Sequence, residues 1–192
     1  QAKAISLYKT VLDTVSRNKA GIDPLKPYLD KINSVQNADQ LVALLAEMEP
    51  EMGLGFFGSY IGADAKNSNK NVIYVGTGSL GLPDRDYYVS DAPDNKEKRE
   101  KYVVHVTRML QYLGESEATA NANAKKILAL ETKMSTATLD RVQRRDRRNT
   151  YNPMSFADLQ KLVPTVKWDT YFQNVGIGKV DSLVVSQPKY IQ

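Results

Sequence analysis

The chain has 192 residues, of which 42% are hydrophobic and 25% are charged, and its formal net charge is +4. These values are ordinary for a globular domain, and the length suffices for one domain or a large part of a bigger protein. The absence of cysteine excludes disulfides and thiolate zinc sites, and no run approaches the roughly 20 apolar residues of a membrane-spanning helix.

Residues 1–50 are expected to form short helices, because their apolar residues recur at helical spacing. The start and stop signals of these helices are Gly21, Asp23, Pro24, Asn37 and Pro50. We expect the first helix to run to Ala20, a second to begin at Asp23, and a third to stop before Pro50. Short helices with short connections predict a packed bundle. No signal peptide is apparent, and the chain is expected to be cut from a larger protein.

Residues 52–76 are predicted to form a β-hairpin. Glycines alternate with aromatic residues over Gly53–Ile61, and Val72–Val75 is β-branched and aromatic. The polar stretch Asp64–Asn71 separates these two runs, which predicts a loop longer than the common two residues.

Residues 80–95 are expected to form a loop, and its first half is chemically unusual. The charged and aromatic residues there are Asp84, Arg85, Asp86, Tyr87 and Tyr88. Tyrosines bury area while placing a hydroxyl on a partner, and Arg85 can pair with a carboxylate or with backbone carbonyls. We predict either an ordered loop anchored by tyrosine, or a loop that contacts another domain or a substrate.

Residues 96–140 are predicted to form two long helices, over Lys96–Leu113 and Glu117–Leu139. The single histidine of the chain, His105, lies on the first of them. Zincins need two histidines four residues apart with a glutamate between them, so we expect His105 to be a structural residue. Glu131 borders the apolar stripe of the second helix. A glutamate at such a boundary either extends to solvent or pairs, and the basic segment that follows offers partners.

That basic segment, Arg141–Arg148, contains five arginines and one aspartate. Three interpretations remain open. The segment can be a solvated face whose arginines pair with Asp146 or Glu131, a surface that docks on an acidic partner, or a nucleic-acid contact. The planar fork of arginine, which pairs with carboxylates through two hydrogen bonds, suits the first two interpretations.

Residues 141–192 are expected to contain this basic segment, short helices and one strand. The predicted features are a turn at Tyr151–Met154, a short helix capped by Ser155, an aromatic segment around Trp168, a strand at Ser182–Val185 and a helical first turn at Pro188–Ile191. The predicted fold class is mainly α, a multi-helix bundle with one β-hairpin insertion, in one continuous piece over residues 1–192.

Five short motifs, in the same order along the chain, resemble the amino-terminal lobe of the neprilysin and endothelin-converting-enzyme family of zinc metallopeptidases. The last three of them form one series. The motifs are Asp64–Asn69 at the hairpin turn, Leu80–Tyr88, Leu130-Glu131, Arg145-Asp146 and Tyr151–Ser155. The resemblance extends from Leu7 to Ile191. The missing cysteines and the absence of an Asn-x-Ser/Thr acceptor make the chain more similar to the bacterial, oligopeptidase O-like branch than to the disulfide-bonded, glycosylated animal members.

The resemblance implies that this chain holds none of the catalytic or metal-binding residues of the family. Family members have a zinc lobe and a helical lobe that closes over it around an internal cavity for peptides, and this chain matches the closing lobe only. Zinc would therefore be bound in the parent protein outside this chain, whose partners would be the catalytic lobe and peptide substrates. Export to a bacterial periplasm or cell surface is the location that the resemblance favours.

Ten residues are candidates for structural or inter-lobe contacts. They are Asp84, Arg85, Asp86, Tyr87, Tyr88, Glu131, Arg145, Asp146, Tyr151 and Asn152. The density of arginine at Arg144–Arg148 departs from the family pattern. Two other classes remain as alternatives: a helical protein-binding module with no enzymatic parent, and a basic nucleic-acid binder, which would lose DNA affinity steeply with salt.

Overall fold

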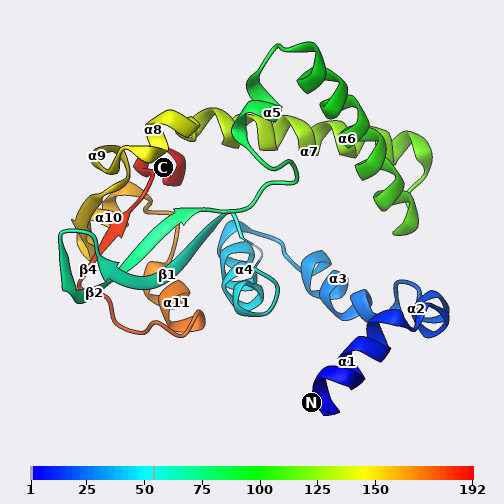
Figure 1. The fold of residues 1–192 in the computed structure, drawn as a ribbon, viewed down its shortest axis with the longest axis horizontal. Coiled ribbons are helices and arrows are strands. Elements are labelled where there is room, and N and C mark those ends of the chain that lie inside the picture. Colours follow the sequence, from blue (N-terminus) through cyan, green and yellow to red (C-terminus); the bar gives the residue numbers. More distant parts are fainter. Residues whose placement is uncertain (1, 54) are drawn as a thin grey trace. The chain divides into compact units, whose positions relative to one another are not determined.

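The computed structural model describes residues 2–53 and 55–192 (Figure 1). The described residues fall into two compact units, within residues 1–35 and 36–192. Gln1, in the predicted piece 1–192, and Leu54, inside the predicted 52–76 hairpin, lie outside the described residues. In the described chain no helix is long and apolar enough to cross a membrane.

The first unit consists of α1 (Ala2–Leu12), α2 (Thr14–Ala20), the 3-10 turn η1 (Asp23–Leu25) and α3 (Lys26–Asn33). The predicted first helix is divided because Asp13 acts as an N-cap, accepting a hydrogen bond from Ser16 N at 2.9 Å. Within the described residues of α1, α2 and α3 none is buried. The short helices predicted within residues 1–50 are divided between the two units, because α4 belongs to the second.

Helix α4 (Ala38–Met52) begins where the sequence predicts and ends later. Asn37 caps it through Gln40 N at 2.9 Å, and Gly53, with φ 63°, closes it. The predicted stop before Pro50 is wrong. A proline near the end of a helix removes one hydrogen bond, and the buried residues of α4 fix the helix against the rest of the unit. These residues are Leu44, Ala46 and Met48.

The predicted hairpin is present, and in the described part of the chain it belongs to a four-stranded sheet. The strands are β1 (Phe57–Asp64), β2 (Asn67–Thr77), β3 (Asn152–Ser155) and β4 (Ser182–Val185), in the order β1-β2-β4-β3. β1 and β2 are antiparallel, β2 and β4 are parallel, and β3 and β4 are antiparallel. The strand predicted at Ser182–Val185 is confirmed as β4, and it joins the hairpin to β3, which was not predicted.

Two local predictions around these strands are wrong. The turn expected at residues 151–154 is mostly strand β3, which tolerates Pro153 because an edge strand can spare one N–H donor. The long polar loop expected at residues 64–71 is a short connection at Ala65 and Lys66. Asp64 stabilises this connection by accepting a hydrogen bond from Lys66 N at 2.8 Å.

The hydrophobic core of the second unit lies between the sheet and α4, α10 (Phe156–Leu162) and α11 (Trp168–Asn174). Figure 1 shows α4 and α11 against the same side of the β1–β2 hairpin. Trp168 is fully buried and lies 5.0 Å from the ring of Phe57 and 5.7 Å from that of Tyr171. The aromatic segment expected around Trp168 therefore forms the centre of the core.

A helical layer follows the hairpin in the same unit. It contains α5 (Arg85–Val89), α6 (Pro93–Tyr112) and α7 (Glu117–Ala137), of which α6 and α7 pack side by side (Figure 1). The two long helices are confirmed, whereas the 80–95 loop is wrong because it contains α5 and the start of α6. A helix of five residues is too short to show apolar periodicity. His105 is exposed on α6, so it is not a core residue.

The remaining helices are α8 (Arg141–Arg145), α9 (Arg147–Thr150) and α12 (Pro188–Ile191). Asp140 and Gln143 form a capping box at α8, and Asp146 caps α9. Ser155 caps α10 as predicted, accepting a hydrogen bond from Asp158 N at 3.1 Å. The prediction of a mainly helical chain is confirmed.

Candidate functional site

Glu131 on α7 fixes the chain that leads into α5. Its Oε1 accepts a hydrogen bond from Gly81 N at 3.0 Å, and its Oε2 accepts one from the Tyr88 hydroxyl at 3.1 Å. The same hydroxyl accepts a hydrogen bond from Leu82 N at 2.6 Å. Tyr88, predicted as an anchor, is buried. Of the alternatives for Glu131, pairing is observed, but its partners are a backbone amide and a tyrosine rather than the basic segment.

Two tyrosine hydroxyls beside Glu131 stay protonated over a wide pH range. Burial raises the pKa of Tyr88 well above its ordinary value, and the carboxylate of Glu131 adds to this effect against the opposing hydrogen bond from Leu82. Burial and the same carboxylate also raise the pKa of Tyr102. Both hydroxyls therefore remain hydrogen-bond donors at neutral pH.

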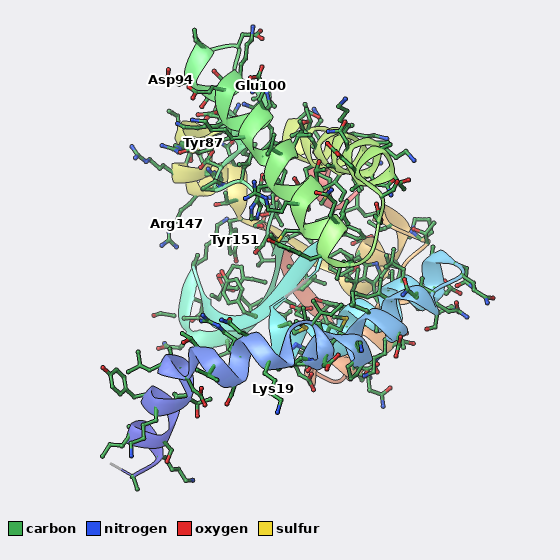
Figure 2. All side chains as sticks on the ribbon, turned by 90° about the vertical axis from the view of Figure 1, so that its right-hand side faces the viewer. Lys19, Tyr87, Asp94, Glu100, Arg147 and Tyr151 are labelled. Carbon is green, nitrogen blue, oxygen red and sulfur yellow. The ribbon has the colours of Figure 1, made fainter. Side chains whose placement is uncertain are left out.

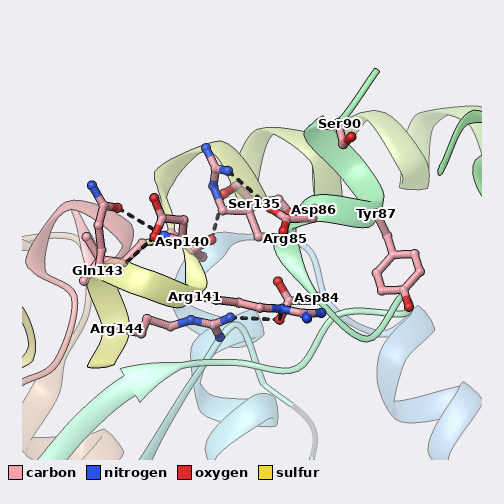
Figure 3. Close-up of polar contacts among 12 residues, drawn as sticks. Asp84, Arg85, Asp86, Tyr87, Ser90, Ser135, Asp140, Arg141, Gln143 and Arg144 are labelled. Atoms are coloured by element: carbon pink, nitrogen blue, oxygen red, sulfur yellow. Dashed lines mark hydrogen bonds and ion pairs between the residues drawn. The ribbon is translucent and has the colours of Figure 1, made fainter. Parts of the chain in front are cut away.

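Asp84 joins the segment before α5 to α8. Its Oδ2 accepts hydrogen bonds from Arg141 Nε at 3.1 Å and Arg144 Nη2 at 2.8 Å (Figure 3). The Asp84 side chain is 13% exposed. Burial acts to raise its pKa, but the hydrogen bonds from Arg144 and Arg141 outweigh burial and hold the pKa of Asp84 below its ordinary value.

Arg85 is only weakly paired. Its side chain is 28% exposed, and its Nη1 lies 3.7 Å from Asp86 Oδ1. Among the described residues, three buried polar atoms have no hydrogen-bond partner: Arg85 Nε, Asp84 Oδ1 and Ser135 Oγ. Figure 3 shows these three side chains in one neighbourhood, with Tyr87 pointing away from them. Such atoms are costly when left unpaired, and the most exposed of the three side chains that carry them in the described chain is that of Arg85.

Tyr87 and Asp146, two further candidate residues, make contacts that do not involve Asp84 or Glu131. The Tyr87 carbonyl accepts a hydrogen bond from Arg99 Nη1 at 2.8 Å, and Lys98 Nζ lies 4.9 Å from the Tyr87 ring. Asp146 pairs with Arg148 at 2.7 Å. These contacts are local to α5–α6 and α8–α9.

Tyr151 and Asn152 connect the basic segment to the sheet. The Tyr151 hydroxyl donates to Asp64 Oδ1 at 2.8 Å, and Asn152 Nδ2 donates to the carbonyl of Val185 at 3.0 Å. Arg145 lies on α8, beside a pocket next to the hairpin. The candidates therefore form two groups, one around Asp84 and Glu131 and one around Tyr151, with α8 between them.

Sequence reasoning missed three residues that complete these groups. Arg141 and Arg144 bind Asp84, and Asp64 binds Tyr151. The arginines belonged to the basic segment, but nothing in their spacing indicates which acidic residue they meet. The capping signal of Asp140 and Gln143 was visible in the sequence and could have placed α8.

The described residues do not fit a zinc site. Among them, no group of three or more His, Cys, Asp or Glu side chains is arranged to hold a metal ion. A catalytic zinc takes three protein ligands, and His105 lies exposed on α6. We therefore derive no metal-dependent step from the residues of this chain.

The family model described as peptidase family M13 matches residues 1–192. The chain belongs to peptidase family M13. The resemblance to neprilysin and endothelin-converting enzyme is thereby confirmed. Endothelin-converting enzyme 1 of Cavia porcellus is 34% identical over 142 residues, which cover 71% of this chain and 19% of that protein. Neprilysin-3 of Drosophila melanogaster is 33% identical over 118 residues, covering 62% of this chain and 15% of that protein.

Solved structures of M13 proteins share the fold of this chain. The inhibitor complex of the zinc metalloprotease Zmp1 of Mycobacterium tuberculosis is 31% identical and superposes with a TM-score of 0.88, covering 96% of this chain and 28% of that one. PepO of Lactobacillus rhamnosis, at 15% identity and a TM-score of 0.71, covers 90% of this chain and 28% of its own and supports the fold alone. The chain spans under a third of each of these proteins.

The two arginines at Asp84 give an asymmetric stability prediction. Asp84→Asn should lower the free energy of unfolding by about 1 kcal/mol, because the exposed arginines regain water. Arg141→Gln with Arg144→Gln should cost about 2 kcal/mol, because it leaves a largely buried carboxylate without a charged partner. Urea unfolding of the isolated chain measures both values.

The stability that Asp84 contributes depends on pH. Because the pKa of folded Asp84 is lowered, its contribution is present above the unfolded pKa of about 3.9 and disappears as the pH falls through the folded value. The difference between the native chain and Asp84→Asn should therefore shrink below about pH 4. A double-arginine variant as stable as the native chain at pH 7 would contradict this account.

Proposed function

We propose that this M13 chain is part of the non-catalytic, closing lobe of a zinc-dependent metalloendopeptidase that cleaves peptides in an enclosed cavity. The main support is the match to the Zmp1 inhibitor complex over 96% of this chain at 31% identity. A family model for peptidase family M13 also matches residues 1–192.

The proposed contribution of the closing lobe is enclosure. A wall around the active site admits peptides by size and excludes bulk water, which strengthens electrostatic interactions inside. It also restricts the orientations of the bound peptide, which lowers the barrier to reaction. Activation of a water molecule by zinc belongs to the part of the parent protein outside this chain.

The partner that we propose for the Asp84 region is the catalytic lobe of the same protein. Three buried polar atoms near Asp84, Arg85 and Ser135 lack hydrogen-bond partners among the described residues. The exposed part of the Arg85 guanidinium can donate to a carbonyl or carboxylate of the other lobe. Arg85 is the best candidate for an inter-lobe contact, because its ion pair with Asp86 is long.

Nucleic-acid binding is less well supported by the contacts of the basic segment. Asp84 binds Arg141 and Arg144, and Asp146 binds Arg148. These acidic partners reduce the positive charge that a nucleic-acid contact requires. A helical module without an enzymatic parent is disfavoured by the family membership. For the parent we propose the bacterial branch of the family, which includes exported enzymes, on the ground that this chain lacks cysteine.

Cleavage assays test the proposed function. The full-length parent should cut fluorogenic peptides of about ten residues, lose activity with a zinc chelator and regain it with added zinc. The 192-residue chain alone should leave the same peptides intact, and calorimetric titration should find no stoichiometric zinc site tighter than micromolar. A parent that stays inactive with zinc present, or a chain that cleaves peptides by itself, would contradict the proposal.

A further inference from the structure

The β1–β2 hairpin and the segment α8–α9 border an open pocket of about 460 Å³, on the side of the sheet away from the core. We name it the arginine–tyrosine pocket. Its principal lining residues are Tyr60, Tyr74, Arg144, Arg145, Arg147 and Tyr151. Figure 2 shows the Arg147 side chain extending from α9 in the direction of the hairpin.

The alternation of the strands explains the aromatic wall of the pocket. Val75 is buried in the core, so its neighbour Tyr74 points to the opposite face, where it meets its cross-strand partner Tyr60. The two rings are stacked, with centroids 5.0 Å apart and planes 12° apart. Tyr60 is 62% exposed, so one face of its ring is free for a further flat group.

Gly62 keeps this wall open. A Cβ atom at Gly62 would lie 3.3 Å from the Tyr60 ring and 3.6 Å from the Tyr74 ring. A larger side chain there would press on both rings and fill the space next to them. The glycine therefore leaves room for a ligand beside the stacked tyrosines.

The arginines of the pocket differ in how far they are neutralised. Arg144 is bound to Asp84. Among the described residues, Arg145 and Arg147 have no hydrogen bond or ion pair to a carboxylate, and no Asp or Glu lines the pocket. The neighbouring Arg148, by contrast, is held by both oxygens of Asp146.

The acidic residue bonded to Tyr151 of the pocket lining already has its own partners. Asp64 accepts hydrogen bonds from the Tyr151 hydroxyl at 2.8 Å and from Lys66 N at 2.8 Å. Lys66 Nζ lies 4.9 Å from the centre of the Tyr151 ring, which adds another positive charge at this rim. The pocket therefore presents uncompensated positive charge beside an exposed aromatic ring.

We infer that the arginine–tyrosine pocket binds a peptide carboxylate attached to an apolar or aromatic group. Arg145 and Arg147 would hold the carboxylate, because the guanidinium fork matches its two oxygens, and the free face of Tyr60 would stack against the attached group. The carboxylate can come from a peptide C-terminus or from an acidic side chain. This binding needs only the chain described here and does not depend on peptidase activity.

Titration of the 192-residue chain with small peptides tests the inference. The probes are acetyl-Ala-Phe with a free C-terminus, the same peptide with a C-terminal amide, and acetyl-Asp-Phe-amide, whose carboxylate is on a side chain. Binding is followed by the NMR signals of the arginine Nε–H groups. We expect the free acid to bind at least about tenfold more tightly than acetyl-Ala-Phe-amide, and the rank of the acetyl-Asp-Phe-amide probe identifies the source of the carboxylate.

Matched variants separate the pocket from the rest of the basic segment. Arg145→Gln with Arg147→Gln should weaken binding of the better carboxylate probe by about tenfold or more. Arg148→Gln, which alters an adjacent arginine outside the pocket lining, should leave it unchanged. Tyr60→Ala should remove the preference for phenylalanine over alanine in the probe. Circular dichroism of each variant should match that of the native chain.

Three results would overturn the inference. The amide could bind as tightly as both carboxylate probes, the double-arginine variant could bind normally, or inorganic phosphate could bind more tightly than either carboxylate. The last result would identify a general anion site. All three are independent of whether the parent cleaves peptides, so they leave the proposed function to its own test.

Discussion

Replacing Trp168 by alanine is expected to lower the free energy of unfolding of the second unit by about 4 kcal/mol. Trp168 is fully buried between Phe57 of β1 and the aromatic residues of its own helix. Its removal loses the transfer free energy of the largest side chain in the core and leaves a cavity that the sheet cannot fill. It also leaves the carbonyl of Val163 without the indole donor, now at 3.2 Å.

Urea unfolding of the isolated chain, monitored by far-ultraviolet circular dichroism, measures this loss. Tyr112→Ala is the matched control, because this aromatic residue of α6 is 63% exposed and its loss should cost less than about 0.5 kcal/mol. Equal unfolding midpoints for the two variants would show that the core does not depend on Trp168.

Replacing Glu131 by alanine is expected to cost roughly 2–3 kcal/mol, because it removes a charged acceptor from Gly81 N and from the buried hydroxyl of Tyr88. The effect should be local as well as global. Hydrogen exchange should become faster at Gly81 and Leu82, whose amides are held by Glu131 and by Tyr88.

Two further variants control for the chemistry of this contact. Glu131→Gln keeps a carbonyl acceptor of the same size and should cost about 1 kcal/mol. Gly81→Ala keeps the carboxylate but places a methyl group against the Tyr102 hydroxyl. It should therefore speed hydrogen exchange at the same two amides without a change of charge. Unchanged exchange at Gly81 in the Glu131→Ala chain would exclude the proposed role of this carboxylate.

The elements that the sequence predicts well are those that carry a long periodic pattern. The two long helices and the hairpin are of this kind. The start of α4 was predicted from a different signal, the capping residue Asn37. The helix α5 and the strand β3 were missed, because they are too short to show a period, whereas β4 and α12, which are equally short, were predicted with their observed bounds. Pro153 also argued against a strand, and only the position of β3 at the edge of the sheet makes it acceptable.

The candidate residues could be chosen from their local sequence, but their partners could not, because these lie far away in the chain. Tyr88 was singled out by its chemistry, but its partner Glu131 is separated from it by 43 residues. Asp84 and Arg144 are separated by 60 residues. Pairing over such distances is set by the packing of α5 and α8 against the rest of the unit, which a single sequence does not reveal. The family was recognisable because its motifs are short and local.

The parallel pairing of β2 with β4 has a consequence for how the second unit folds. Residues 73–75 pair with residues 183–185, about 110 positions later in the chain, so the sheet closes only after a long loop has been ordered. During synthesis, one edge of β2 stays open until β4 has left the ribosome, and exposed strand edges invite aggregation. The hairpin and the α6–α7 pair can form early from local contacts, whereas the Trp168 core must wait for the last strand.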